Sequence, residues 1–300
     1  MKQHQFSGTG VALVTPFRQG AIDYPALERI IEHVISGGVD YIVSLGTTGE
    51  AITLSAQECR DVLDFTIEKV ARRVPIVAGF FGGNFTEALV AKIRQYNFDG
   101  IAAIMCSSPA YSKPSQEGIY QHYMAVEQAS PIPIIIYNVP GRTSSNILPD
   151  TILRLAHASE RFAAVKEASG DLVQAMKIIK NRPEHLLVLS GDDPLTLPMI
   201  AAGGNGAISV IANALPAPFS DMVRAALNND LTTARRLNLD LLDVHPWLYV
   251  EGNPPGIKAA MEVLELCTRE VRIPLTPVSE ATRQGLQQEL AKVLGAAVKA

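Results

Sequence analysis

The chain has 300 residues, 47% of them hydrophobic, with 26 Lys and Arg against 30 Asp and Glu. A formal net charge of −4 without a basic run argues against nucleic-acid binding, and no apolar stretch reaches the roughly 20 residues that a membrane span needs. The three cysteines are far apart in sequence, and residues 1–16 lack the apolar segment of a secretory signal. We therefore expect a soluble cytoplasmic protein with free thiols.

Short apolar segments of strand length alternate with segments of helical periodicity as far as residue 211. The predicted strands are residues 10–14, 41–45, 75–80, 100–106, 133–137, 162–165, 186–189 and 207–211. The predicted helices between them are residues 25–38, 55–73, 86–96, 116–128, 149–157, 172–180 and 195–202. Eight such units favour a closed parallel (β/α)8 TIM barrel over the alternative, a doubly wound open sheet, which usually has fewer units.

The chain after residue 216 carries helical patterns and no further strand signal. The predicted helices in this part are residues 217–228, 231–244, 255–266 and 279–294. We therefore divide the chain into a barrel domain, residues 1–230, and a small C-terminal helical region, residues 231–300. Apart from the β/α unit itself, the sequence has no repeat and no low-complexity segment.

Lys166 directly follows the apolar strand predicted at residues 162–165. The carboxyl ends of barrel strands carry the catalytic groups of TIM-barrel enzymes. An apolar site there disfavours the ammonium form, and the neutral amine is the form that attacks a carbonyl carbon to give a Schiff base. The alternative is a lysine whose head reaches solvent or pairs with the adjacent Glu167.

Other predicted strand exits carry groups suited to a small carboxylate substrate. Thr47 and Thr48 lie in a glycine-rich turn, where hydroxyl and backbone N–H groups can hold a carboxylate. Tyr137 ends the strand 133–137 and could relay protons, while Arg142 could clamp a carboxylate bidentately. Tyr111 lies in a proline-bounded loop. Taken singly, each of these residues also has a structural explanation: a turn, a core tyrosine or a surface arginine.

The sequence offers no pattern for a metal or a nucleotide cofactor. The six histidines are scattered without ligand spacing, and the glycine-rich segment 203–206 is neither a dinucleotide fingerprint nor a P-loop. Glu50 and the pair Asp192 and Asp193 are expected to be structural or solvated. A Schiff-base lysine would perform its covalent chemistry without an external cofactor.

Four motifs together resemble the signatures of the dihydrodipicolinate synthase family. They are Gly46-Thr47-Thr48-Gly49-Glu50, Tyr137-Asn138-Val139-Pro140-Gly141-Arg142-Thr143, Lys166-Glu167-Ala168 and Gly206-Ala207-Ile208-Ser209-Val210. The resemblance extends from about residue 8 to the C-terminal helices. It implies a lyase that condenses pyruvate with L-aspartate 4-semialdehyde through a lysine Schiff base, giving 4-hydroxy-tetrahydrodipicolinate for lysine and diaminopimelate biosynthesis.

The resemblance also implies a role for each matching residue. The catalytic residues would be Lys166, Tyr137, Thr47 and Tyr111. Lys166 would be the nucleophile and the other three a proton relay, in which Tyr111 reaches into a neighbouring subunit's site. The substrate-binding residues would be Thr48, Arg142 and Ile208. Thr48 and Ile208 would contact pyruvate through backbone groups, and Arg142 would receive the carboxylate of the second substrate. The implied assembly is a homotetramer of two tight dimers.

The region matching the effector site of lysine-inhibited members departs from their pattern. Those members have polar side chains where this chain has Ala51, Ala56, Cys59, Ala88 and Ala110, and only Asn84 is polar here. A lysine effector brings an ammonium and a carboxylate that both need partners once they leave water. We therefore expect weak or absent inhibition by L-lysine.

Other functions remain open from the sequence. A sibling aldolase that cleaves N-acetylneuraminate or a 2-keto-3-deoxy sugar acid would use the same lysine, although Arg142 suits a short carboxylate better. A catalytically silent barrel for ligand sensing or assembly is an alternative of another class, against which the joint presence of Lys166, Tyr137 and Thr47 argues. A phosphosugar aldolase is less favoured, because the loops after the last two strands show no phosphate cradle.

Overall fold

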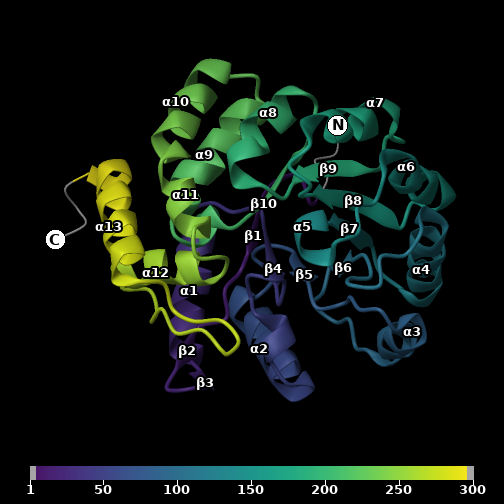
Figure 1. Cartoon of the computed structure of the whole chain (residues 1–300), viewed down its shortest axis with the longest axis horizontal. Helices are drawn as coiled ribbons and strands as arrows, with labels where there is room; N and C mark the ends of the chain where they lie inside the picture. The colour runs from purple at the N-terminus through teal and green to yellow at the C-terminus, as the bar shows by residue number, and fades with distance from the viewer. Residues whose placement is uncertain (1–4, 296–300) are drawn as a thin grey trace.

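The computed structural model describes residues 5–295, in which eight parallel strands close into a barrel (Figure 1). Around the barrel the order is β1-β10-β9-β8-β7-β6-β5-β4, and β1 pairs with both β10 and β4 to close it. The strands are β1 Gly8–Ala12, β4 Tyr41–Ser44, β5 Ile76–Ala78, β6 Ala103–Ser107, β7 Ile134–Asn138, β8 Phe162–Glu167, β9 Leu187–Ser190 and β10 Gly206–Ser209. The predicted (β/α)8 barrel is confirmed.

Eight helices follow the strands and surround the barrel (Figure 1). They are α1 Tyr24–Ser36, α2 Ala56–Val70, α3 Thr86–Gln95, α4 Gln116–Ala129, α6 Pro149–Ala158, α7 Leu172–Asn181, α8 Thr196–Ala201 and α9 Pro216–Leu227. A capping box begins α2: the backbone N–H of Glu58 donates to Ser55 Oγ at 3.1 Å, and that of Ser55 donates to Glu58 Oε2 at 2.8 Å.

Several short elements were not predicted. The strands β2 Phe17–Arg18 and β3 Ala21–Ile22 form a hairpin, and the segment expected as a loop after β7 contains a one-turn helix, α5 Pro140–Thr143. Three 3-10 turns also occur, η1 Ala51–Thr53, η2 Asp193–Leu195 and η3 Ile211–Asn213. The last of these shortens the strand predicted at 207–211. These elements are too short for hydrophobic periodicity to reveal them.

The core has two layers because alternate residues of each strand point to opposite sides of the barrel wall. The barrel interior is filled by one cluster that includes Tyr41, Met105, Leu189 and Ile208. A larger cluster lies between the strands and the surrounding helices. Tyr41 packs where Gly10 has no side chain, since a Cβ at Gly10 would lie 2.2 Å from the tyrosine ring. The interior is therefore closed, and only its mouth can hold a ligand.

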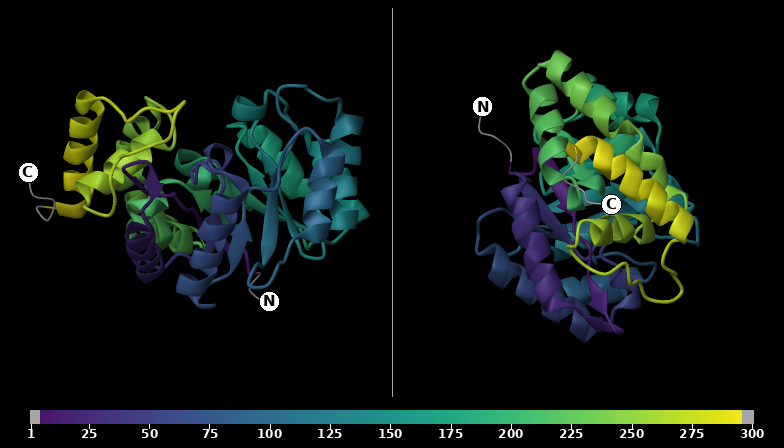
Figure 2. Two further views of the ribbon diagram at one scale, coloured as in Figure 1. Left: turned by 90° about the horizontal axis from the view of Figure 1, so that it is seen from below. Right: turned by 90° about the vertical axis from the view of Figure 1, so that its left-hand side faces the viewer.

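The C-terminal region is helical, as predicted, but has one more helix than expected. Its helices are α10 Leu231–Leu242, α11 Val244–Tyr249, α12 Pro255–Val263 and α13 Glu280–Leu294. In Figure 2 (left) the yellow helix α13 lies at the opposite end of the molecule from α3 and α4. None of the helices in residues 5–295 is both long and apolar enough to cross a membrane.

The C-terminal region is tied to the barrel by buried polar contacts. Lys258 of α12 pairs with Glu50 at 2.5 Å, and both side chains are almost completely buried. The Lys258 amine also donates to the Glu270 carbonyl at 2.9 Å and lies 4.0 Å from the centroid of the Phe17 ring. Burial lowers the pKa of Lys258, although the negative charge of Glu50 acts in the opposite direction. Glu50 is thus a structural residue, as expected, because its carboxylate is committed to this pair.

Candidate active site

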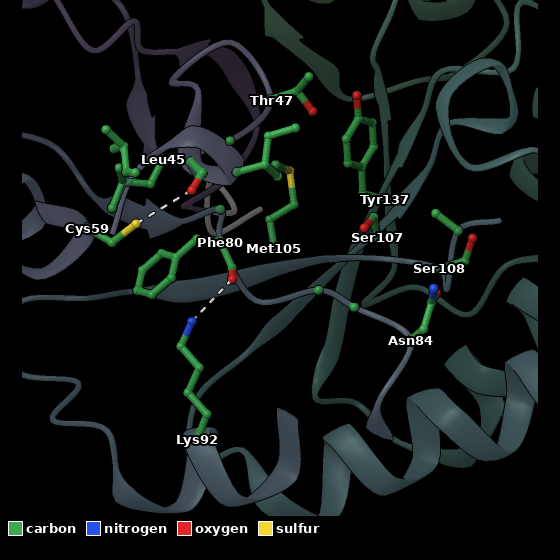
Figure 3. A pocket seen from close by; sticks show the side chains of 18 of the residues that line it. Leu45, Thr47, Cys59, Phe80, Asn84, Lys92, Met105, Ser107, Ser108 and Tyr137 are labelled. Atoms are coloured by element: carbon green, nitrogen blue, oxygen red, sulfur yellow. Dashed lines mark hydrogen bonds between the residues drawn. The ribbon is translucent and has the colours of Figure 1, made fainter. Parts of the chain in front are cut away.

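A cavity of about 1260 Å³ lies beside the carboxyl ends of β4, β5, β6 and β7 (Figure 3). Three of the predicted site residues line it: Thr47 after β4, Tyr137 of β7 and Arg142 of α5. Figure 3 shows Thr47 and Tyr137 on the same side of the cavity, with Met105 close by. The fold thus gathers side chains that are up to 95 residues apart in sequence at one end of the barrel.

Lys166 lies beside this group, in the neighbouring strand. It is the register partner of Tyr137, and its Nζ atom is 4.5 Å from the centroid of the Tyr137 ring. Only 5% of the residue is exposed. Within residues 5–295 its amine forms no ion pair and no hydrogen bond, which is unusual because buried charges are normally paired.

Glu167 points to the other side of β8, as the alternation of a strand requires. Its carboxylate accepts from Asn138 Nδ2 at 3.0 Å, from the Ser169 backbone N–H at 2.8 Å and from Gln174 Nε2 at 3.1 Å. These contacts lie between the barrel wall and α7. The alternative in which Glu167 neutralises Lys166 is therefore wrong, and at 5% exposure Lys166 does not extend over the surface.

Gly191 makes room for Lys166, a role that the sequence reading missed. It directly follows β9, and a Cβ at this position would lie 3.0 Å from Lys166 Cε and 3.1 Å from its Cγ. The same Cβ would lie 2.6 Å from the Ala168 Cβ. The sequence does show a glycine immediately after a predicted strand. Such a glycine often marks a place where a ligand or another part of the chain comes close to the backbone.

The turn after β4 brings Thr47 and Thr48 to the mouth. Leu45 has φ 62°, and the backbone N–H groups of Gly49 and Glu50 donate at 3.1 Å to the carbonyls three residues earlier. Thr47 is half-buried beside the cavity. Thr48 is buried, and its hydroxyl oxygen accepts a hydrogen bond of 3.0 Å from Asn253 Nδ2.

Arg142 is exposed on the one-turn helix α5, and its Nη2 donates to the Asn253 carbonyl at 3.3 Å. Asn253 lies between α11 and α12, in a region where no site residue was predicted. It is therefore a second residue that the sequence reading missed. Asn253 and Thr48 are 205 residues apart in sequence, so local hydrophobic periodicity cannot predict their contact.

The remaining predicted residues differ in their surroundings. Ile208 is buried in β10, in the interior cluster that also contains Tyr137. Tyr111 is 92% exposed, and its backbone has φ 65°. Its backbone N–H donates to the Thr143 carbonyl at 3.1 Å. In the part of the chain that the structure describes, no hydrogen bond joins the hydroxyls of Thr47, Tyr137 and Tyr111.

The effector-region residues named from the sequence line the same cavity. These are Ala51, Ala56, Cys59, Asn84, Ala88 and Ala110. The charged side chains that line the cavity are Arg60, Lys92 and Arg142, all of them basic, and no Asp or Glu among residues 5–295 lines it. Burial raises the pKa of the Cys59 thiol, which leaves it neutral. No group of His, Cys, Asp and Glu suited to a metal ion occurs among residues 5–295.

Known proteins resemble this chain over nearly its whole length. The model of the dihydrodipicolinate synthetase family matches residues 5–293. A 4-hydroxy-tetrahydrodipicolinate synthase of Flavobacterium psychrophilum is 48% identical over 92% of this chain and 94% of its own. The crystal structure of dihydrodipicolinate synthase from Aquifex aeolicus has a TM-score of 0.93 and 39% identity, covering 98% of this chain and 100% of that chain.

A third relative has been solved with pyruvate bound. The chloride-inhibited dihydrodipicolinate synthase from Acinetobacter baumannii, complexed with pyruvate, has a TM-score of 0.92 and 36% identity, covering 96% of this chain and 98% of that chain. The family model and these matches extend over nearly the whole length of the sequence. The chain therefore belongs to the dihydrodipicolinate synthetase family.

Proposed function

We propose that the chain condenses pyruvate with L-aspartate 4-semialdehyde through a Schiff base on Lys166, giving 4-hydroxy-tetrahydrodipicolinate. The observation that carries this proposal is the Lys166 amine, buried at the end of β8 without a carboxylate partner in the described residues. The name shared by the relatives supports the same reaction, which serves lysine and diaminopimelate biosynthesis.

The chemistry follows from an amine and two carbonyl compounds. The neutral Lys166 amine attacks C2 of pyruvate, water leaves, and the imine loses a proton from C3 to become an enamine. The enamine carbon attacks the aldehyde carbon of the second substrate, and the imine re-forms. The amino group of that substrate then attacks C2 and displaces Lys166 as the ring closes. The protonated imine nitrogen is the electron sink in these steps, so the lysine supplies the covalent catalysis.

The other side chains take roles that fit their positions. Tyr137 transfers protons at the new imine, since its ring lies against the Lys166 amine. Thr47 and Tyr111 extend the relay to solvent. Thr48 and Ile208 bind the pyruvate moiety, and Arg142 receives the carboxylate of the aldehyde.

The relay requires a second copy of the chain in this proposal. Tyr111 is 92% exposed and cannot serve its own site from the surface, whereas it could reach into that of a neighbour. Ile52 and Phe85 are 95% and 68% exposed, an amount of apolar surface that favours contact with another subunit. We propose a homotetramer of two tight dimers, working in a reducing cytoplasm that keeps Cys59, Cys106 and Cys267 as free thiols.

A substrate panel tests the proposal. Purified protein is assayed with pyruvate and a series of aldehydes, L-aspartate 4-semialdehyde first, and separately with N-acetylneuraminate and 2-keto-3-deoxy sugar acids for cleavage. Condensation with aspartate semialdehyde at the highest kcat/KM is expected. Preferred cleavage of a sugar acid would instead assign the chain to the sibling aldolases.

A further inference from the structure

Asn253 connects two residues that the proposed function assigns to different substrates. Its side-chain Nδ2 donates to Thr48 Oγ1 at 3.0 Å, and its main-chain carbonyl accepts from Arg142 Nη2 at 3.3 Å. The two partners are 205 and 111 residues away in sequence. The segment between α11 and α12 thereby bridges the turn after β4 and the helix after β7.

The hydrogen bond to Thr48 has a direction that matters for ligand binding. Because Thr48 Oγ1 accepts from the Asn253 amide, its own O–H proton is not used in that bond. No hydrogen bond of residues 5–295 uses this proton, and the residue is only 3% exposed. The amide thus leaves the Thr48 hydroxyl as a free donor, which is what a substrate carboxylate requires.

Asn253 itself is poorly satisfied, which argues against a purely structural role. The residue is 8% exposed, and its Oδ1 atom is buried without a hydrogen-bond partner in the described residues. Buried polar atoms of native proteins normally have partners, and an unsatisfied one costs stability. A residue retained only for stability would use both ends of its amide. Here only the end that contacts Thr48 is used.

Resting on the proposed function, we infer that Asn253 is a positioning residue for pyruvate: its side-chain amide orients the Thr48 hydroxyl toward the substrate carboxylate. The side chain acts on the pyruvate site, while the main-chain carbonyl holds Arg142 for the aldehyde. The two contacts can therefore be separated by mutation. The C-terminal helical region also completes the active site of the barrel in this arrangement.

The experiment is a double-mutant cycle on the assembled enzyme with Asn253→Ala, Thr48→Val and the combined variant. Asn253→Ala should raise the KM for pyruvate about 3- to 10-fold, the range for one neutral hydrogen bond, and leave the KM for aspartate semialdehyde unchanged. The double variant should bind pyruvate no worse than Thr48→Val alone, because Asn253 acts through that hydroxyl. The melting temperature of Asn253→Ala should not fall, since the unsatisfied Oδ1 is removed.

Two further variants sharpen the result. Asn253→Asp should raise the KM for pyruvate more than Asn253→Ala does, because the carboxylate accepts the Thr48 proton and repels the substrate. Asn205 lies at the other end of the barrel, where its side chain accepts from the Val188 backbone N–H at 3.1 Å. Asn205→Ala should lower the melting temperature and leave both KM values unchanged.

The outcomes separate this inference from the proposed function. Unchanged pyruvate KM in Asn253→Ala, additive effects in the double variant, or equal increases in both KM values would overturn the positioning role while wild-type condensation stands. Absence of condensation by the wild-type protein would overturn the proposed function itself.

Discussion

Tyr137 and Lys166 are register partners in the adjacent parallel strands β7 and β8. Register partners point to the same side of a sheet, so the pairing alone directs the phenol and the amine toward the same end of the barrel interior. The 4.5 Å between the Lys166 Nζ and the Tyr137 ring centroid follows from this pairing. A shift of one residue in either strand would separate the two groups completely.

Removing the Tyr137 hydroxyl tests its role in proton transfer. Tyr137→Phe keeps the ring beside the amine but loses the O–H, so kcat should fall by about 100- to 10,000-fold, the contribution of a positioned acid–base group. Tyr123→Phe is the matched control, because the Tyr123 hydroxyl donates to the Cys106 carbonyl at 2.8 Å behind the barrel wall. The measurement is the steady-state kcat of both variants. A Tyr137→Phe variant with wild-type kcat would exclude a role of Tyr137 in proton transfer.

Arg142→Ala should weaken the aldehyde substrate selectively. Loss of a charge-assisted contact to a carboxylate costs about 1.5–3 kcal/mol, so the KM for aspartate semialdehyde should rise about 10- to 150-fold. Pyruvate should still form its imine at a wild-type level. Arg154→Ala is the control, since Arg154 pairs with Glu117 on the surface at 2.7 Å. If the two arginine variants behaved alike, Arg142 would not be a substrate ligand.

L-lysine at millimolar concentration should inhibit weakly or not at all. The effector-region residues do line one cavity, but among residues 5–295 its charged side chains are Arg60, Lys92 and Arg142, so no carboxylate lines it to pair with the ammonium groups of lysine. Asn84 is the polar residue of the predicted set. Dose–response curves at saturating pyruvate and near its KM provide the measurement. Half-inhibition far below a millimolar would contradict this interpretation of the cavity.

Stability should decrease in acid through the pair Glu58 and Arg272, which joins α2 to the C-terminal region at 2.5 Å. The Arg272 guanidinium lowers the pKa of Glu58 from 4.5 to about 2, with help from the Ser55 backbone N–H. The folded-state pKa is depressed, so this stabilisation is fully present above pH 4.5 and is lost as the pH falls toward 2.

The variant Glu58→Gln measures that contribution. It should lower the free energy of unfolding at pH 7 by about 1–2 kcal/mol, a value reduced by partial solvent exposure of the pair. The difference from the wild type should shrink on acidification. Glu68→Gln, on the exposed face of the same helix, should cost little at any pH. A constant difference for Glu58→Gln between pH 7 and pH 3 in denaturant unfolding would refute the linkage.

The sequence predicted the barrel because each of its eight strands is a separate apolar segment with a helix after it. It also predicted that Lys166 ends a buried strand, from the apolar residues before it. It did not reveal the helix α11, whose Pro246 in the first turn resembles a helix terminator. Asn253 and Gly191 were missed for another reason: their roles depend on contacts with Thr48 and Lys166 that only the closed barrel creates.

Chemical trapping of the imine tests the central claim most directly. The protein is incubated with pyruvate and borohydride, and intact mass and peptide mapping then locate the reduced three-carbon adduct. We predict one adduct per chain, on Lys166, and none in a folded Lys166→Ala variant, which should also lose nearly all turnover. No adduct on the wild-type chain, or an adduct on a different lysine, would contradict the assignment of Lys166 as the nucleophile.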